Sequence, residues 1–175
     1  MRVGFAARAM VVFACGLTLA MATCGRAGAE PRSAGDRYFI DFRARSSHYI
    51  GHTFVIYYRV DASSHIAEQH LAGLVPEEDV WNGILSPIRA TIRKYKDDTT
   101  VPAGMVYRRQ LSEAEYARVV RTVQFFQSQP QRWHLIFNNC NDFAIEIAET
   151  LGLRRPPSLM PPSVWVGTLR ALNEP

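Results

Sequence analysis

The sequence predicts an α+β domain, because its first half favours strands and its second half favours helices. The segment His52–Val60 is dense in β-branched and aromatic residues, which is typical of a strand. In the second half, apolar residues recur at helical spacing after Ser112 and again after Cys140. We therefore expect an antiparallel sheet of about five strands, packed against a helix that carries a cysteine at its N-terminus.

The N-terminal segment of the chain has the pattern of a secretory signal peptide. Arg2 and Arg8 precede an apolar stretch, Ala9–Ala22, and small residues lead up to Ala29. The stretch of about 14 residues is shorter than the roughly 20 that a membrane-spanning helix needs. We expect cleavage after Ala29 and export of the mature protein to the periplasm or the medium. Retention as an uncleaved anchor and lipid attachment at Cys24 are the alternatives.

Removal of this segment changes both the charge and the cysteine content. The 20 basic and 16 acidic residues of the whole chain become nearly balanced, because the segment holds three arginines and no acidic residue. A balanced charge argues against a surface for nucleic acid or anionic membranes. Cys140 is then the one remaining cysteine, so no internal disulfide can form. Residues 30–175 are enough for a single domain with one core.

Strand candidates follow one another through the first half of this domain. His52–Val60 is the strongest, and the polar run Asp61–Ser64 predicts a turn directly after it. The other candidates are Tyr38–Arg43, His65–Leu71, one or two strands within Ile84–Tyr95, and Gly104–Arg109.

The helical half opens with a capping box, Ser112-Glu113-Ala114-Glu115, followed by one apolar helical face. A short strand or extended segment, Trp133–Phe137, leads to a second helix with Asn139 as its N-cap. Gly152 is the expected stop signal of that helix. The proline-rich run 154–162 predicts an extended strap before a short last helix at about 163–172.

Cys140 is the candidate nucleophile. At a helix start, unpaired backbone N–H groups and the helix dipole stabilise a thiolate, so we expect a lowered thiol pKa. The neighbours Asn138, Asn139, Asn141 and Asp142 make this turn polar rather than core-like. A packed, inert cysteine and an intermolecular disulfide are the alternatives.

A cysteine nucleophile needs a base, and His52 is the candidate because it stands at the start of the strongest strand. If the following turn centres near Asp61, His70 lies opposite His52 in the hairpin. Cross-strand partners are close enough for one ring to orient the other. Glu68 and Gln69 are the alternatives for this third group. Glu68 shares the face of His70, and a shift of one residue in register would bring Gln69 or Leu71 opposite His52 instead.

Other chemistries lack support in the sequence. His48 and His52 have the spacing of a zinc-binding helix, but on a strand they would lie about 13 Å apart. No Gly-x-Ser-x-Gly elbow and no glycine-rich phosphate loop occurs in the chain. We therefore expect no metal, no cofactor and no nucleic-acid partner.

Two segments together resemble a known group of enzymes. The strand Gly51-His52-Thr53-Phe54-Val55 comes first, and the helix start Asn138-Asn139-Cys140-Asn141-Asp142-Phe143-Ala144 comes late. This order resembles the circularly permuted papain-like enzymes, which include permuted NlpC-type peptidases and lecithin retinol acyltransferase-like proteins. The resemblance covers roughly residues 48–151. It implies Cys140 as nucleophile, His52 as general base and His70 as the orienting group.

In such a site the Cys140 backbone N–H would stabilise the oxyanion, with help from the Asn138 or Asn139 side chain.

Three functions follow as hypotheses. The first is an exported cysteine hydrolase, a thiol protease or amidase acting on a peptide such as cell-wall peptide. The second is an acyltransferase or thioesterase acting on an acyl lipid, and the third is an inactive binding module. Residues 30–175 show no apolar insertion helix, which favours the first.

Overall fold

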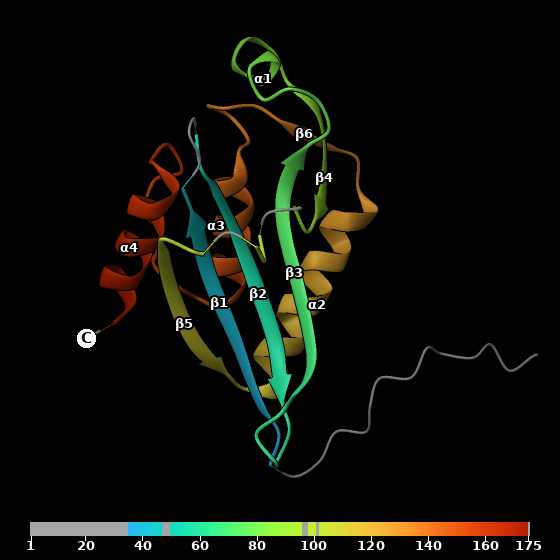
Figure 1. Ribbon diagram of the computed structural model, residues 1–175, viewed down its shortest axis with the longest axis vertical. Helices are drawn as coiled ribbons and strands as arrows, with labels where there is room; N and C mark the ends of the chain where they lie inside the picture. The colour runs from blue at the N-terminus through green and yellow to red at the C-terminus, as the bar shows by residue number, and fades with distance from the viewer. Residues whose placement is uncertain (1–34, 47–49, 96–97, 101, 175) are drawn as a thin grey trace, which may run out of the picture. The chain divides into compact units, whose positions relative to one another are not determined.

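The computed structural model of the chain is α+β, as the sequence predicts, and its described residues form a six-stranded antiparallel sheet and four helices (Figure 1). The structure describes residues 35–46, 50–95, 98–100 and 102–174. They belong to one compact unit, Pro31–Pro175. The predicted signal peptide and His48 lie outside the described residues. No helix of the described ranges is both long and apolar enough to cross a membrane.

The sheet has the strand order β5-β1-β2-β3-β4-β6. The strands are β1 (Arg37–Arg45), β2 (His52–Val60), β3 (Ile66–Pro76), β4 (Ile88–Arg93), β5 (Met105–Leu111) and β6 (Gln131–Trp133). The expected number of five was too low, because β6 has only three residues and so carries no periodic pattern. The expected extended segment 133–137 is also wrong beyond Trp133. His134 and Asn138 close a turn through two backbone hydrogen bonds.

The helices are α1 (Asn82–Leu85), α2 (Glu113–Ser128), α3 (Cys140–Thr150) and α4 (Pro162–Asn173). The predicted capping box starts α2, since Ser112 accepts the N–H of Glu115 and the Glu115 carboxylate accepts the N–H of Ser112. Asn139 caps α3, and Gly152 follows it with a φ of +69°. The strand expected within residues 84–95 is present as β4, and residues 84 and 85 before it belong to α1.

The three longer helices lie on one face of the sheet (Figure 1). Val55 and Tyr57 of β2 join the core that these helices cover. Phe54 and Ile56 belong to a second apolar cluster on the opposite face. Because β2 is buried on both faces, its sequence is almost continuously apolar, as is usual for a central strand.

Strand β3 pairs with β2 over only part of its length. The pairing runs from Val60↔Ile66 to Val55↔Ala72, and from Gly73 onward β3 pairs with β4 instead. Strands β2 and β3 therefore separate where β2 begins. Figure 1 shows β3 turning away from β2 at this end.

The register between β2 and β3 differs from the expected one. His70 pairs with Tyr57 and stacks on its ring at 5.1 Å, so the prediction that His70 lies opposite His52 is wrong. The chain turns beyond Asp61, whose carboxylate accepts the backbone N–H groups of Ser63 and His65. If the centre of a hairpin turn moves by one residue along the chain, each residue of the first strand faces a residue two positions further along the second strand. A small error in the predicted turn position therefore gave His52 the wrong partner.

Candidate active site

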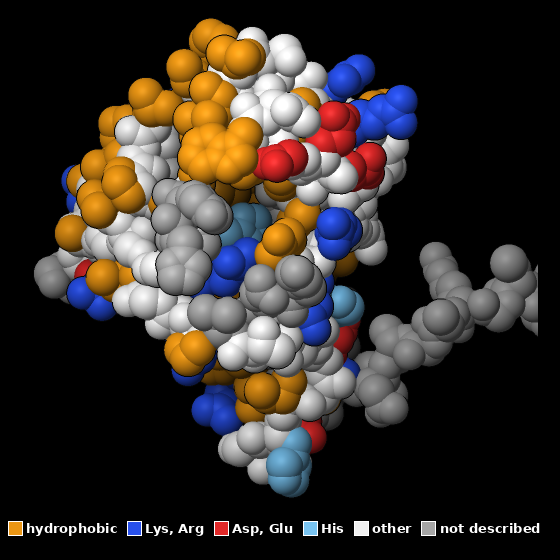
Figure 2. Space-filling view, turned by 45° about the horizontal axis from the view of Figure 1, so that its top comes forward, with side chains coloured by type: hydrophobic (Ala, Val, Ile, Leu, Met, Phe, Trp, Pro, Cys, Tyr) orange, Lys and Arg blue, Asp and Glu red, His pale blue; other side chains and the backbone are white. Residues whose placement is uncertain are grey.

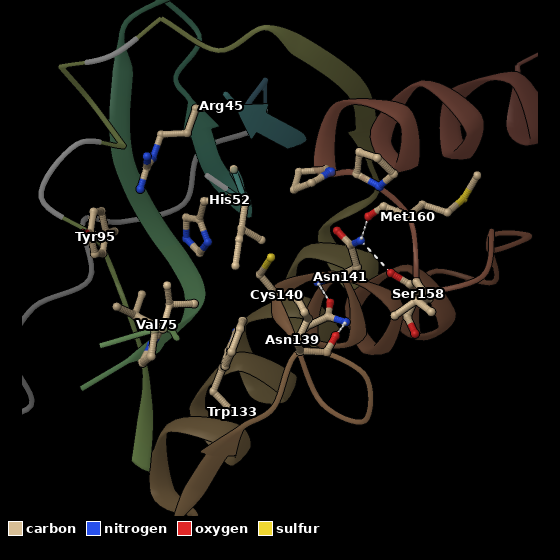
Figure 3. Close-up of a pocket in the computed structure, with 18 residues that line it drawn as sticks. Arg45, His52, Val75, Tyr95, Trp133, Asn139, Cys140, Asn141, Ser158 and Met160 are labelled. Atoms are coloured by element: carbon tan, nitrogen blue, oxygen red, sulfur yellow. Dashed lines mark hydrogen bonds between the residues drawn. The ribbon is translucent and has the colours of Figure 1, made fainter. Parts of the chain in front are cut away.

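A pocket of about 610 Å³ lies where β2 and β3 separate (Figure 3). Its polar lining includes Cys140, Asn139 and Asn141 at the start of α3, His52 on β2 and Arg45 on β1. The apolar lining residues include Ile50, Val75, Val80, Trp133, Leu135, Leu159 and Met160. A mostly apolar cavity of this size with a few polar groups is typical of a small-molecule or substrate site.

Cys140 occupies the first position of α3 and is 6% exposed. Burial raises the pKa of its thiol, because a thiolate would lose its hydration. Hydrogen bonds from the backbone N–H and the hydroxyl of Thr53 lower the thiol pKa, and so do the backbone N–H groups at the start of α3. Their combined effect is smaller than that of burial. The expectation of a lowered thiol pKa is therefore wrong: the helix start is present, but burial has the larger effect.

His52 is the first residue of β2 and is 7% exposed. Burial, and then the positive charge of Arg45, lower the pKa of His52 from 6.5 to about 3. The imidazole is therefore neutral throughout the physiological range. Its ring lies over Gly73 of β3, where a Cβ atom would come within 2.8 Å of His52 Nε2. The absence of a side chain at Gly73 makes room for this ring.

Cys140 enters the pocket from the face of the sheet that the helices cover, and His52 enters it from the opposite face. His52 stacks on Phe54, with 5.8 Å between ring centroids, on the face away from the helices. Thr53, the next residue, faces α3, where its hydroxyl donates to Asn141 Oδ1 at 2.6 Å. Both side chains nevertheless line the pocket, because β3 has left the side of β2 at this point (Figure 3). The structure thus brings together a neutral thiol and a neutral imidazole, with no hydrogen bond between them in the described part of the chain.

Asn138 and Asn139, the predicted oxyanion helpers, brace the loop before α3. Asn138 Nδ2 donates to the carbonyl of Arg132 at 2.6 Å, and Asn139 Nδ2 donates to that of Leu135 at 2.9 Å. Asn139 Oδ1 also accepts the N–H of Asn141 at 2.8 Å. Of the two, Asn139 lines the pocket. Their amide groups thus hold the geometry of the α3 start.

The residues predicted to orient His52 lie elsewhere. His70 is 44% exposed at its side chain and is hydrogen-bonded to Glu68 at 2.6 Å. Glu68 also faces Arg59, and Gln69 pairs with Tyr58. None of the three predicted orienting residues lines the pocket.

An acidic side chain that no sequence motif marks approaches His52 instead. Asp98 Oδ2 lies 3.9 Å from His52 Nε2. Asp98 is 4% exposed and is held by Arg45 Nε at 3.1 Å and by the backbone N–H of Tyr95 at 2.8 Å. Asp98 stands in a polar stretch with no motif around it, so only the fold indicates its place beside the imidazole.

Asn141 is a second residue that the sequence did not single out, apart from its place in the polar turn. Its Nδ2 donates to the carbonyls of Ser158 at 2.7 Å and Met160 at 2.8 Å (Figure 3). Its Oδ1 accepts from the Thr53 hydroxyl. Asn141 therefore fastens the strap to α3 and β2. The fastened part of the strap, residues 158–162, forms one wall of the pocket.

Exposed apolar side chains border the pocket. Leu159 lines it and is 62% exposed. Trp81 and Phe137, both exposed, lie within two residues of lining positions in the chain. Figure 2 shows hydrophobic side chains gathered over the end of the domain that carries α1. Within the described ranges, no three or more His, Cys, Asp or Glu side chains are grouped so as to hold a metal ion.

The thiol pKa makes a prediction about alkylation. We expect iodoacetamide to label Cys140 slowly at pH 7 and faster as the pH rises beyond the ordinary thiol pKa of about 8.5, because burial holds the proton on the sulfur. The measurement is the labelling rate between pH 5 and 10, followed by intact mass. The same protein in urea is the control and should follow the ordinary thiol curve. A rate already at its plateau near pH 6 would contradict the effect of burial.

The chain matches no protein-family model, no curated protein and no solved structure.

Proposed function

We propose that this protein is a cysteine hydrolase that holds the acyl part of its substrate as a thioester on Cys140, on a fold of the circularly permuted papain-like type. The observation that supports this most is the convergence of Cys140, at the N-terminus of α3, and His52, at the start of β2, on one pocket. In such enzymes the base histidine precedes the cysteine in the chain, as it does here. An exported location remains a prediction from the N-terminal sequence pattern.

The neutral state of both groups points to a particular form of acyl transfer. Cys140 Sγ attacks the substrate carbonyl carbon while His52 takes the thiol proton, so that no free thiolate has to form in the buried site beforehand. The oxyanion meets the backbone N–H groups at the start of α3. His52 then gives the proton to the leaving nitrogen or oxygen as its bond to the carbonyl carbon breaks.

Hydrolysis completes the cycle. Water attacks the thioester carbon, His52 takes a proton from the water, and the carbon–sulfur bond breaks. The proton returns from His52 to Cys140, which releases a carboxylic acid and restores the neutral pair. Each half-reaction thus uses His52 once as a base and once as an acid.

The pocket lining favours a lipophilic acyl group, and with it the thioesterase or acyltransferase form of this function. Among the described residues of the lining, Arg45 alone carries a charge, and Asp98 already binds it. A cell-wall peptide would bring charged groups that find no partner there, and an unpaired buried charge is strongly unfavourable. An acyl chain would instead bury apolar surface against Val75, Trp133 and Leu135. A peptide amide remains the alternative substrate class.

The test uses p-nitrophenyl acetate, p-nitrophenyl octanoate and a peptide p-nitroanilide with the purified protein. We expect an acyl adduct on Cys140 in the intact mass, no adduct in Cys140→Ala, and acylation at least about 100-fold slower in His52→Gln. His65→Gln is the matched control, since His65 is an exposed histidine of the β2–β3 turn. It should acylate like the wild type.

The comparison of probes separates the substrate classes. A lipophilic acyl group predicts that kcat/KM rises at least about tenfold from acetate to octanoate, because the longer chain fills the apolar pocket. Higher activity on the peptide probe than on the octanoate would support the peptidase form. Absence of a Cys140 adduct with all three probes would overturn the proposed function and leave a binding module.

A further inference from the structure

The His52 imidazole has a buried nitrogen that no other described residue hydrogen-bonds. Its Nε2 atom is fully enclosed and has no hydrogen-bond partner in the described part of the chain. A buried polar atom without a partner is unfavourable, so such atoms are uncommon in folded proteins. Asp98 Oδ2, at 3.9 Å, is the charged atom that faces it.

The Asp98 carboxylate is held in place from two sides. Arg45 Nε donates to Oδ1 at 3.1 Å, and the Tyr95 backbone N–H donates to Oδ2 at 2.8 Å. The Arg45 guanidinium itself lies over the Tyr95 ring, 4.7 Å from its centroid. Arg45 balances the charge of Asp98, so the carboxylate can stand beside a neutral imidazole without requiring its protonation. The cluster thus presents a fixed acceptor to His52.

The chemistry of the two groups then determines where the imidazole proton resides. A carboxylate only accepts hydrogen bonds, and a neutral imidazole has one N–H and one lone pair. Beside Asp98 Oδ2, the N–H belongs on Nε2, which leaves the lone pair on Nδ1. A separation of 3.9 Å is longer than a hydrogen bond, but such contacts are often long in free enzymes and tighten when substrate binds.

We propose that Asp98 is the positioning residue of the site: it accepts the Nε2–H of His52 and so keeps the Nδ1 lone pair available to take the Cys140 proton. The tautomer assignment stands on the geometry alone, and its catalytic meaning rests on the proposed function. Asp98 takes the role that the sequence assigned to His70. It reaches the imidazole from the segment after β4 and not from the neighbouring strand.

The direct test is the tautomer of His52, read from the 15N spectrum of histidine-labelled full-length protein at pH 7. His52→Gln identifies the signals of this ring. We expect the Nε2-protonated form in the wild type, and loss of this preference in Asp98→Ala. Asp98→Asn should retain it in part, since its amide oxygen still accepts. An Nδ1-protonated wild type would overturn the proposal, and this outcome does not depend on whether the Asp98 variants fold.

A matched control separates the position of Asp98 from the general loss of a buried ion pair. Asp41 is likewise buried and bound by two arginines, Arg43 and Arg108. It lies opposite Ile56 on β2, about 13 Å along the strand from His52. Asp41→Asn should therefore leave the His52 tautomer unchanged. If Asp41→Asn shifts it as much as Asp98→Asn does, the positioning role fails.

Kinetic measurements distinguish failure of this proposal from failure of the proposed function. With the octanoate probe, Asp98→Asn should lower kcat at least about tenfold with little change in KM, because Asp98 is not among the residues that line the pocket. Normal kcat in Asp98→Asn and Asp98→Ala, with Cys140 still acylated, would overturn the positioning role alone. A wild type that is never acylated would overturn the proposed function, while the tautomer result would still decide the structural assignment.

Discussion

Replacement of Asn141 by alanine is expected to lower the free energy of unfolding by about 3–5 kcal/mol. Asn141 is 2% exposed, and its side chain binds the Thr53 hydroxyl and the carbonyls of Ser158 and Met160. The substitution leaves the Thr53 hydroxyl and the Met160 carbonyl without this partner in a water-poor region, at about 1–3 kcal/mol for each that stays unsatisfied, whereas the Ser158 carbonyl still accepts the Met160 N–H. Urea denaturation measures the change. The same variant should also lose acylation activity, because residues 158–162 form a wall of the pocket.

Asn173 provides a matched control for this prediction. It makes a similar set of contacts at the other end of the strap, accepting the Arg154 N–H and donating to the carbonyls of Arg154 and Leu169. Asn173 is only half-buried, so water can replace these bonds in Asn173→Ala. We expect a loss of about 1 kcal/mol there. If both variants lose the same free energy of unfolding, burial does not strengthen the contribution of the Asn141 hydrogen bonds.

Replacement of Trp165 by alanine is the second large expected effect, a loss of about 3–5 kcal/mol. Trp165 is fully buried in α4, and its ring lies 6.4 Å from that of Phe42 on β1. Alanine would leave a cavity between α4 and the sheet that the packed surroundings cannot fill. Thermal and urea denaturation should show the loss, and both should remain cooperative.

Trp165→Phe tests which part of this residue matters. The indole Nε1 is buried without a hydrogen-bond partner among the described residues, so phenylalanine removes an unsatisfied N–H and retains an aromatic ring. The expected loss is smaller, about 1–2 kcal/mol from the reduced volume. A loss as large as that of Trp165→Ala would contradict packing as the main contribution.

Local patterns predicted most of the elements. The bounds of β2 agree with the sequence, because β-branched and aromatic residues define both ends of the run. The capping box before α2 and the N-cap at Asn139 were found because each is a contact between near neighbours in the chain. Elements without a pattern were missed: α1 has four residues and β6 has three.

The candidate site was only partly predictable. Cys140 and His52 were chosen by residue type and position, and the structure places both in one pocket. The residue that faces the His52 imidazole was not predicted, because the β2–β3 register depends on where the turn lies. The Asp61 carboxylate accepts the backbone N–H groups of Ser63 and His65, which places the turn beyond Asp61. Asp98 comes from a distant segment, so no spacing rule relates it to His52.

The sequence by itself determined the α+β class, the strand that holds His52 and the helix start that holds Cys140, because propensity and capping act over a few neighbouring residues. The tertiary structure alone decided the protonation states and the partners. Burial in the folded domain raises the thiol pKa of Cys140 and lowers the pKa of His52, since desolvation disfavours the charged form of each. The separation of β2 from β3 opens the pocket, and chain segments far apart in sequence bring Asp98 to the imidazole.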